Sequence, residues 1–174
     1  MRTLILGGAR SGKSRHAESL AASHTGSVVY LATARAEDAE MAERIARHRA
    51  SRPAAWKTLE VPLALPEALR EQDRPDRFLL VDCLTLWLTN LLLEAPDDAV
   101  VEARIEALVA VVEGLSANTA LVANEVGLGI VPDNALARRF RDHAGRLHQA
   151  LAGVCERVVL MVAGLPMTVK EEIA

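Results

Sequence analysis

The chain has 174 residues, of which 51% are hydrophobic and 25% are charged. This composition is typical of one globular domain and excludes a disordered or fibrous chain. The formal net charge of -3 and the isoelectric point near 6.0 exclude the strongly basic surface typical of proteins that bind nucleic acid. A ligand that carries phosphate must therefore be held by local groups.

The start of the chain and its cysteines indicate a cytoplasmic protein. We expect no leader peptide, because Met1 and Arg2 lead directly into the short apolar run at residues 3–6. No apolar stretch approaches the roughly 20 residues that a membrane helix needs. Cys83 and Cys155 lie beside apolar runs and form no C-x-x-C pair, so we expect buried thiols in a reducing compartment.

Strands and helices are expected to alternate along the chain. Continuous apolar runs predict strands at residues 3–6, 27–33, 56–61, 78–81, 119–123 and 157–163. Amphipathic spacing predicts helices at residues 13–23, 37–49, 64–71, 84–93, 98–115 and 134–153. The last helix is expected to begin at Asp133 as N-cap and to bury a stripe of Leu136, Phe140, Ala144, Leu147 and Leu151. The pattern predicts a single α/β domain over residues 1–174, with a mostly parallel sheet and helices on both faces.

A phosphate-binding motif lies between the first predicted strand and the first predicted helix. It matches G-x-x-x-x-G-K-[ST] in full, with the residues Gly7, Gly8, Ala9, Arg10, Ser11, Gly12, Lys13 and Ser14. Glycines let the backbone turn its N–H groups toward phosphate oxygens, and the helix adds its positive end. Lys13 is expected to reach the outer phosphates, and the hydroxyl of Ser14 to bind Mg²⁺. The place of the motif between a strand and a helix favours this function over a chance match.

Asp82 directly follows the predicted strand at residues 78–81 and is the candidate acid that organises Mg²⁺. It can instead be an N-cap for the next helix. Ligands of parallel sheets bind beyond the carboxyl ends of the strands, where Asp82, Thr33 and the P-loop are all expected. The N-K-x-D motif of switch GTPases is absent from the sequence, which leaves a small-molecule kinase or a transferase.

Four segments of the sequence resemble a known family. They are residues 7–18 (GGARSGKSRHAE), 30–34 (YLATA), 40–53 (EMAERIARHRASRP) and 124–137 (NEVGLGIVPDNALA). In these segments the chain is similar to the bifunctional adenosylcobinamide kinases / adenosylcobinamide-phosphate guanylyltransferases of cobalamin biosynthesis, and the likeness covers nearly the whole chain. The resemblance implies a RecA-like P-loop NTPase fold and a homotrimer.

The same resemblance implies two successive reactions. ATP or GTP first phosphorylates adenosylcobinamide, and GMP from GTP is then transferred to adenosylcobinamide phosphate. The second reaction passes through a guanylyl-histidine and gives adenosylcobinamide-GDP and pyrophosphate. The implied cofactor is Mg²⁺, the implied substrates are GTP, ATP, adenosylcobinamide and its phosphate, and neither a nucleic-acid partner nor a membrane span is expected.

The resemblance places the histidine that accepts GMP at His48. Together with Lys13 of the phosphate-binding motif, His48 is therefore a candidate catalytic residue. A neutral imidazole is a competent nucleophile near neutral pH. Considered without the family, His48 follows Met41 and Ile45 at helical spacing, which is equally typical of a hydrogen-bonded core histidine. The spacing of the other histidines to cysteine or aspartate predicts no zinc site.

The resemblance also places Ala32, Thr33, Ala34, Glu60 and Asp82 beside the guanine nucleotide. Further candidate nucleotide contacts are Arg49, Ala50, Ser51 and Arg52. Arginines suit phosphate oxygens, but Arg49 and Arg52 can equally form a solvated basic helix end. Glu60 can accept hydrogen bonds from the guanine edge or can be a surface acid. Ser14 and Asp82 are the candidate ligands of Mg²⁺.

Two other functions stay open. The chain can be a P-loop kinase for another small alcohol, which would form no covalent histidine intermediate. It can also be a non-catalytic or weakly hydrolytic nucleotide-binding regulatory module, which would show no turnover that depends on an acceptor.

Overall fold

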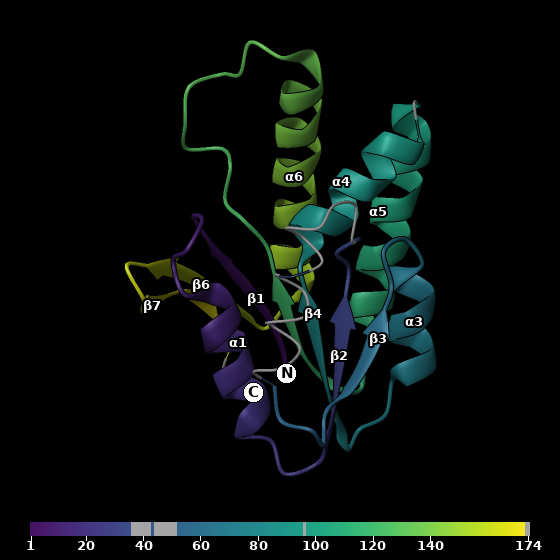
Figure 1. Cartoon of the computed structure of the whole chain (residues 1–174), viewed down its shortest axis with the longest axis vertical. Helices are drawn as coiled ribbons and strands as arrows, with labels where there is room; N and C mark the ends of the chain where they lie inside the picture. Colours follow the sequence, from purple (N-terminus) through teal and green to yellow (C-terminus); the bar gives the residue numbers. More distant parts are fainter. Residues whose placement is uncertain (36–42, 44–51, 96, 173–174) are drawn as a thin grey trace.

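The computed structural model describes residues 1–35, 43, 52–95 and 97–172. Within this part the sheet has seven strands, in the order β3-β2-β4-β5-β1-β6-β7 (Figure 1). They are β1 (Arg2–Gly7), β2 (Ser27–Ala32), β3 (Lys57–Glu60), β4 (Arg77–Asp82), β5 (Asn118–Val122), β6 (Arg157–Val162) and β7 (Leu165–Glu171). All neighbouring strands are parallel except β6 and β7. The predicted mostly parallel α/β architecture is confirmed.

The described helices cover the two faces of the sheet unequally. One face packs against α1 (Lys13–Ala22), and the other against α3 (Leu65–Gln72), α4 (Leu84–Glu94), α5 (Asp98–Glu113) and α6 (Ala135–Val154) (Figure 1). Successive side chains of a strand point to opposite faces, so Leu4 of β1 lies in the core beneath the four helices and Ile5 in the core beneath α1.

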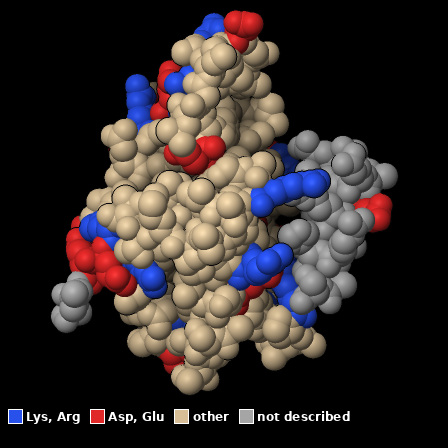
Figure 2. Space-filling view, turned by 90° about the vertical axis from the view of Figure 1, so that its left-hand side faces the viewer, with Lys and Arg blue, Asp and Glu red and all other residues tan. Residues whose placement is uncertain are grey.

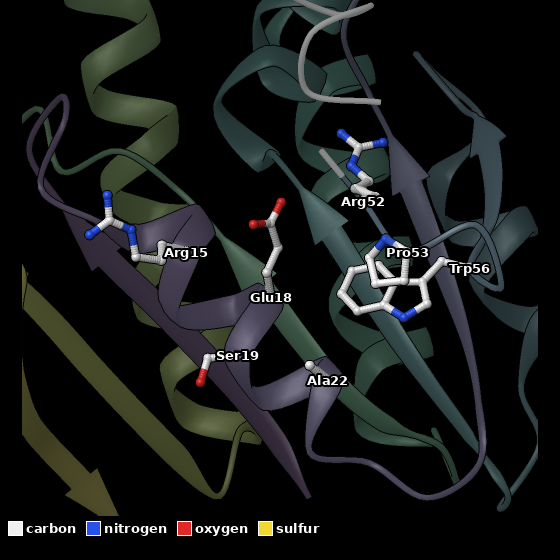
Figure 3. Close-up of a pocket in the computed structure, with 7 residues that line it drawn as sticks. All are labelled: Arg15, Glu18, Ser19, Ala22, Arg52, Pro53 and Trp56. Carbon is white, nitrogen blue, oxygen red and sulfur yellow. The ribbon is translucent and has the colours of Figure 1, made fainter. Parts of the chain in front are cut away.

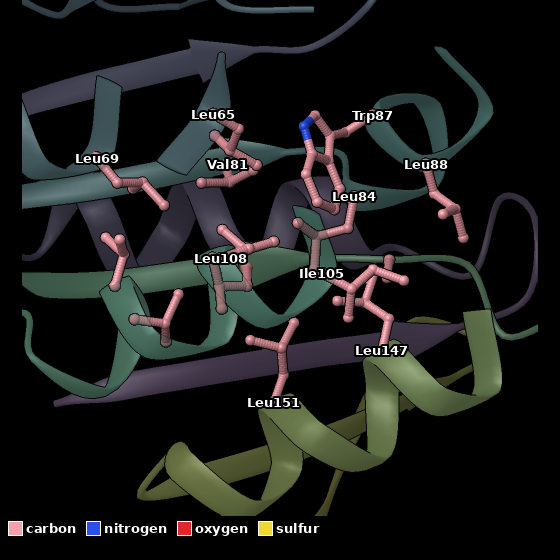
Figure 4. Packing of buried hydrophobic residues seen from close by; sticks show 14 of the residues in the cluster. Leu65, Leu69, Val81, Leu84, Trp87, Leu88, Ile105, Leu108, Leu147 and Leu151 are labelled. Carbon is pink, nitrogen blue, oxygen red and sulfur yellow. The ribbon is translucent and has the colours of Figure 1, made fainter. Parts of the chain in front are cut away.

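The larger core holds the four helices against the sheet. Leu108 of α5, Leu147 and Leu151 of α6 and Trp87 of α4 are almost completely buried there (Figure 4). The indole N–H of Trp87 donates to the carbonyl of Leu63 at 3.0 Å, so its one polar group is satisfied. Each fully buried leucine stabilises the fold by about 1.5–3 kcal/mol. This packing holds the four helices against one face of the sheet.

The start of α6 differs from the prediction. Its N-cap is Asn134, whose side chain accepts a hydrogen bond from the N–H of Ala137 at 3.1 Å, and not Asp133. Leu136, which was expected in the buried stripe, is 46% exposed. The first turns of α6 extend beyond the ends of the strands (Figure 1), so this leucine has no sheet to pack against.

The edge strand β7 was not predicted. It follows β6 through Ala163 and Gly164, whose φ angles of 51° and 85° are those of a tight hairpin turn. Its sequence contains Pro166, which cannot donate to a strand ladder and weakens the strand pattern. Pairing with β6 supplies the hydrogen bonds that the local sequence does not suggest.

The two cysteines differ in their burial. Cys83 and Cys155 are both free thiols, but only Cys155 is fully buried, since Cys83 lies at the end of β4 beside the edge of the sheet. In the described ranges no helix has the length and apolar character needed to cross a bilayer.

Candidate active site

The P-loop has the conformation that its motif predicts. It connects β1 to α1, and Gly12, at the N-cap of α1, has φ 97°. A Cβ on Gly7 would lie 2.7 Å from both the carbonyl oxygen of Met161 and the hydroxyl oxygen of Ser11, so the loop has no room for a side chain there. The free N–H groups at the N-terminus of α1 are oriented to bind an anion.

Neighbouring segments hold the loop in place on both sides. The N–H of Gly164, in the β6–β7 turn, donates to the carbonyl of Ser11 at 3.0 Å. The N–H of Glu125, which follows β5, donates to the carbonyl of Gly7 at 3.0 Å. The unpredicted hairpin therefore supports the loop, and Glu125, in the segment 124–137 that resembles the family, lies beside it.

Lys13 begins α1 and is only 7% exposed. Its ammonium donates to the carbonyl of Gly8 at 2.6 Å. Burial lowers the pKa of Lys13, and the nearby Cys83 and Asp82 act against this shift. The ammonium of Lys13 therefore lies against the loop that would hold phosphate.

Three residues form a row across the carboxyl edge of the sheet. Ala32, the last residue of β2, pairs with Glu60 of β3 on one side and with Asp82 of β4 on the other. Side chains of residues that pair across neighbouring strands lie on the same face of the sheet. The strands β3 and β4, on either side of β2, are about 10 Å apart. Ala32 packs against the core beneath α1, which includes Tyr30 of β2 and Leu80 of β4. The two carboxylates therefore flank the methyl group of Ala32 on one face of the sheet.

Thr33, predicted to touch nucleotide, uses its side chain within the protein. It is fully buried, and its hydroxyl donates to the carbonyl of Cys83 at 2.6 Å and accepts from the N–H of Cys83 at 2.9 Å. Its carbonyl accepts from the side chain of Asn90 at 2.9 Å. Thr33 holds the ends of β2 and β4 together, whereas Ala32 and Ala34 remain half-buried at the edge.

The residues present fit a magnesium ion. Ser14 lies in the first turn of α1. Asp82 is the last residue of β4, and the charge of its carboxylate acts on Lys13. One oxygen of Asp82 accepts from the hydroxyl of Tyr30 at 2.9 Å. Oxygen ligands from one or two side chains, together with phosphate, are what Mg²⁺ prefers. In the part of the chain that the structure describes, no group of three acidic, histidine or cysteine side chains could hold a metal by itself.

A pocket of about 300 Å³ lies beside the P-loop helix (Figure 3). One wall is the outer face of α1, and the other is the segment that precedes β3. Its lining residues are Arg15, Glu18, Ser19, Ala22, Arg52, Pro53 and Trp56. Of these residues, Arg52 was predicted to contact nucleotide, whereas Arg15 and Trp56 are brought together only by folding.

The remaining predicted site residues are His48, Arg49, Ala50 and Ser51, together with the helix expected at residues 37–49. All four residues, and nearly all of that helix, lie outside the described residues. Arg52 is described, and its guanidinium carbon lies 3.3 Å from the centre of the Tyr30 ring. Arg52 therefore contacts Tyr30, whose hydroxyl donates a hydrogen bond to Asp82.

Comparison with known proteins places this geometry in a family. Residues 3–169 match the cobinamide kinase / cobinamide phosphate guanyltransferase family. The chain is 58% identical over 172 residues to the bifunctional adenosylcobalamin biosynthesis protein CobP of Pseudomonas aeruginosa, with 99% of each chain covered. It is 42% identical over 182 residues to the corresponding protein CobU of Escherichia coli K12, with 98% of this chain and 100% of that protein covered.

A solved structure from Pyrococcus horikoshii OT3 is also similar. It has a TM-score of 0.56 at 10% sequence identity and covers 99% of this chain and 87% of its own. At that identity the likeness concerns the fold alone. The family match and the two relatives extend over nearly the full chain, and the protein therefore belongs to the cobinamide kinase / cobinamide phosphate guanyltransferase family.

Proposed function

We propose that this protein is a bifunctional enzyme of adenosylcobalamin biosynthesis. It phosphorylates the hydroxyl of adenosylcobinamide with ATP or GTP, and it then transfers GMP from GTP to adenosylcobinamide phosphate through a guanylyl-histidine at His48. The observation that carries the proposal is the row of Glu60, Ala32 and Asp82 beside a fully formed P-loop. A P-loop kinase without guanine specificity needs no second carboxylate at this edge.

In the kinase step, the P-loop holds the triphosphate and Lys13 neutralises charge on its outer phosphates. The acceptor hydroxyl forms a bond to the γ-phosphorus, the bond from that phosphorus to the bridging oxygen breaks, and the hydroxyl proton leaves to a base. Nucleoside diphosphate and adenosylcobinamide phosphate are the products. Mg²⁺, bound by Ser14 and Asp82, supplies charge neutralisation on the phosphate oxygens when present.

In the guanylyl step, a ring nitrogen of His48 forms a bond to the α-phosphorus of GTP, and pyrophosphate leaves. A phosphate oxygen of adenosylcobinamide phosphate then attacks the same phosphorus, and the phosphorus–nitrogen bond breaks. The histidine is regenerated and adenosylcobinamide-GDP is released. Glu60 can accept from N1–H and the exocyclic amine of guanine, and Arg49 and Arg52 can neutralise phosphate oxygens. Ala34, Ala50 and Ser51 complete the proposed nucleotide contacts.

The covalent intermediate gives a direct test. The protein is incubated with Mg²⁺ and GTP labelled at the α-phosphorus, denatured, and assayed for bound label. We expect label that is acid-labile and base-stable, that is absent with γ-labelled GTP, and that adenosylcobinamide phosphate discharges. His48→Ala should retain no label. His24→Ala is the matched control, because His24 contacts the carbonyl of Asp76 at 3.1 Å at the far end of α1.

The outcomes separate the alternatives. If GTP binds and remains intact while no label is retained, the covalent mechanism is wrong and a kinase for a small alcohol is favoured. If neither label nor any acceptor-dependent turnover is found, the protein is a nucleotide-binding regulatory module.

We also propose that the protein assembles as a homotrimer in the cytoplasm. Large apolar side chains are exposed on the β6–β7 hairpin and on the loop before α6, namely Val162, Leu165, Met167, Val169, Leu128, Ile130 and Val131. Figure 2 shows that charged side chains are sparse in the middle of the face on this side of the molecule. Contiguous exposed apolar surface favours a protein partner, and free thiols favour a reducing compartment.

A further inference from the structure

Tyr30 connects two parts of the candidate active site. It lies in the middle of β2 and is only 2% exposed. Its register partner on β4 is Leu80, so Asp82 is two residues further along that strand and on the same face. The ring is long enough to bridge this diagonal, and its hydroxyl donates to Oδ2 of Asp82 at 2.9 Å.

In this hydrogen bond Tyr30 is the donor and Oδ2 of Asp82 is the acceptor. Among the described residues, Tyr30 is the only group that donates a hydrogen bond to this carboxylate. The carboxylate is thereby held through Oδ2, and no described residue donates a hydrogen bond to Oδ1.

The face of the same ring holds a cation. The guanidinium carbon of Arg52 lies 3.3 Å from the ring centre, within the range of a cation–π contact. Arg52 follows His48 closely in the sequence. The charge of Asp82, by contrast, acts on Lys13 of the P-loop. One side chain therefore contacts both the proposed phosphate-binding arginine and the proposed metal ligand.

We propose that Tyr30 is a positioning residue with two separable roles. Its hydroxyl orients Asp82 toward Mg²⁺, and its ring holds Arg52 over the nucleotide phosphates. This inference rests on the proposed roles of Asp82 and Arg52. A purely structural tyrosine would contribute only to the core beneath α1, where it also packs.

The hydroxyl role is tested by metal binding instead of turnover. Mn²⁺ is titrated by electron paramagnetic resonance into the protein saturated with GDP. Tyr30→Phe should weaken Mn²⁺ binding by about 10- to 100-fold, as is usual when a group that supports a metal ligand is lost. Asp82→Asn should weaken it at least as much, and the double variant should be no weaker than Asp82→Asn alone. Unchanged binding in Tyr30→Phe, or additive losses in the double variant, would overturn the proposal.

The ring role is tested by comparing Tyr30→Phe with Tyr30→Leu. GDP affinity is measured by calorimetry in the presence of a chelator, so that the metal makes no contribution. Tyr30→Phe keeps the ring and should bind as the wild type does, whereas Tyr30→Leu should bind roughly 2- to 30-fold more weakly. Equal GDP affinity in the two variants would overturn the ring role.

Two further measurements exclude trivial explanations. Thr119→Val removes another buried strand hydroxyl, which donates to the carbonyl of Ala117 at 3.1 Å far from the carboxyl edge, and it should leave Mn²⁺ affinity unchanged. Tyr30 is the only tyrosine of the chain, so 3-fluorotyrosine labels it alone. Its ¹⁹F resonance should shift when Mg²⁺ is added to the GDP complex, and an unmoved resonance would count against the proposal even where Tyr30→Phe fails to fold.

The proposed function can fail independently of this inference. If the wild type forms no guanylyl adduct but Tyr30→Phe weakens Mn²⁺ binding as described, the enzymatic proposal is wrong and the role of Tyr30 stands. If the adduct forms while Mn²⁺ binding is unaffected, only the role of Tyr30 is wrong.

Discussion

The ammonium of Lys13 donates to the carbonyl of Gly8 at 2.6 Å, so the P-loop lysine folds back over its own loop. A neutral carbonyl compensates a buried cation poorly, and burial lowers the pKa of Lys13. A phosphate oxygen would be a far better partner. Lys13 is therefore a functional residue that costs stability, and this leads to the first prediction.

Lys13→Met should abolish transfer without unfolding the protein. Loss of the cation should slow guanylylation by at least about 100-fold, as for other groups that stabilise developing charge. The melting temperature should be unchanged or higher, since a buried charge is removed. The matched control is Lys57→Met, at an exposed lysine of β3. It should change neither the rate of guanylylation nor the melting temperature. A large fall in the melting temperature of Lys13→Met would show that the lysine is structural.

Glu60→Gln should weaken discrimination between guanine and adenine. A carboxylate can accept from both donors of the guanine edge, whereas an amide offers one acceptor and one repelling donor. We expect GTP affinity to fall by about 10- to 100-fold, with little change for ATP, in competition binding experiments. Glu71→Gln, on the helix that covers the other face of the sheet, should change neither affinity. Equal loss of both nucleotides would rule out a role in reading the base.

Met167→Glu should disrupt the oligomer. Met167 is 51% exposed on β7, and a charge there would have to be desolvated in an interface. Size-exclusion chromatography with light scattering should show a trimer for the wild type and smaller species for the variant. Val100→Glu is the control, because Val100 is also 51% exposed but lies on α5. A wild type that is monomeric at high concentration contradicts the proposed trimer.

Stability should fall in acid through Glu156. Hydrogen bonds from Arg2 lower the pKa of Glu156 from 4.5 to about 2. A carboxylate with a depressed folded-state pKa stabilises the protein above its unfolded-state value, and this contribution is lost as the pH falls from 4.5 toward about 2. Because the pair is partly exposed, we expect up to about 1 kcal/mol.

The check is chemical denaturation of the wild type and Glu156→Gln over that pH range. The variant should be less stable near neutral pH, and the difference should vanish in acid. Glu106→Gln, at an exposed position of α5, should follow the wild type. A constant difference between Glu156→Gln and the wild type at all pH values would assign the effect to packing and not to ionisation.

Much of the fold could be predicted because its signals are local. The strands that end at Gly7 and Asp82 are continuous apolar runs, and the P-loop requires glycine at positions such as Gly7, where a side chain would collide. The exception is β7, whose sequence is weak as a strand and which forms because β6 offers an unpaired edge.

The sequence by itself determined the P-loop, the order of the described elements before β7 and the family resemblance, since each depends on neighbouring residues or on motif spacing. Only the tertiary structure decided that Ala32 separates Glu60 from Asp82, that Thr33 is used within the protein, and that Tyr30 joins Asp82 to Arg52. These relationships depend on the register between strands far apart in the chain. A shift of one residue would turn every side chain of a strand to the opposite face, and no local pattern encodes that choice.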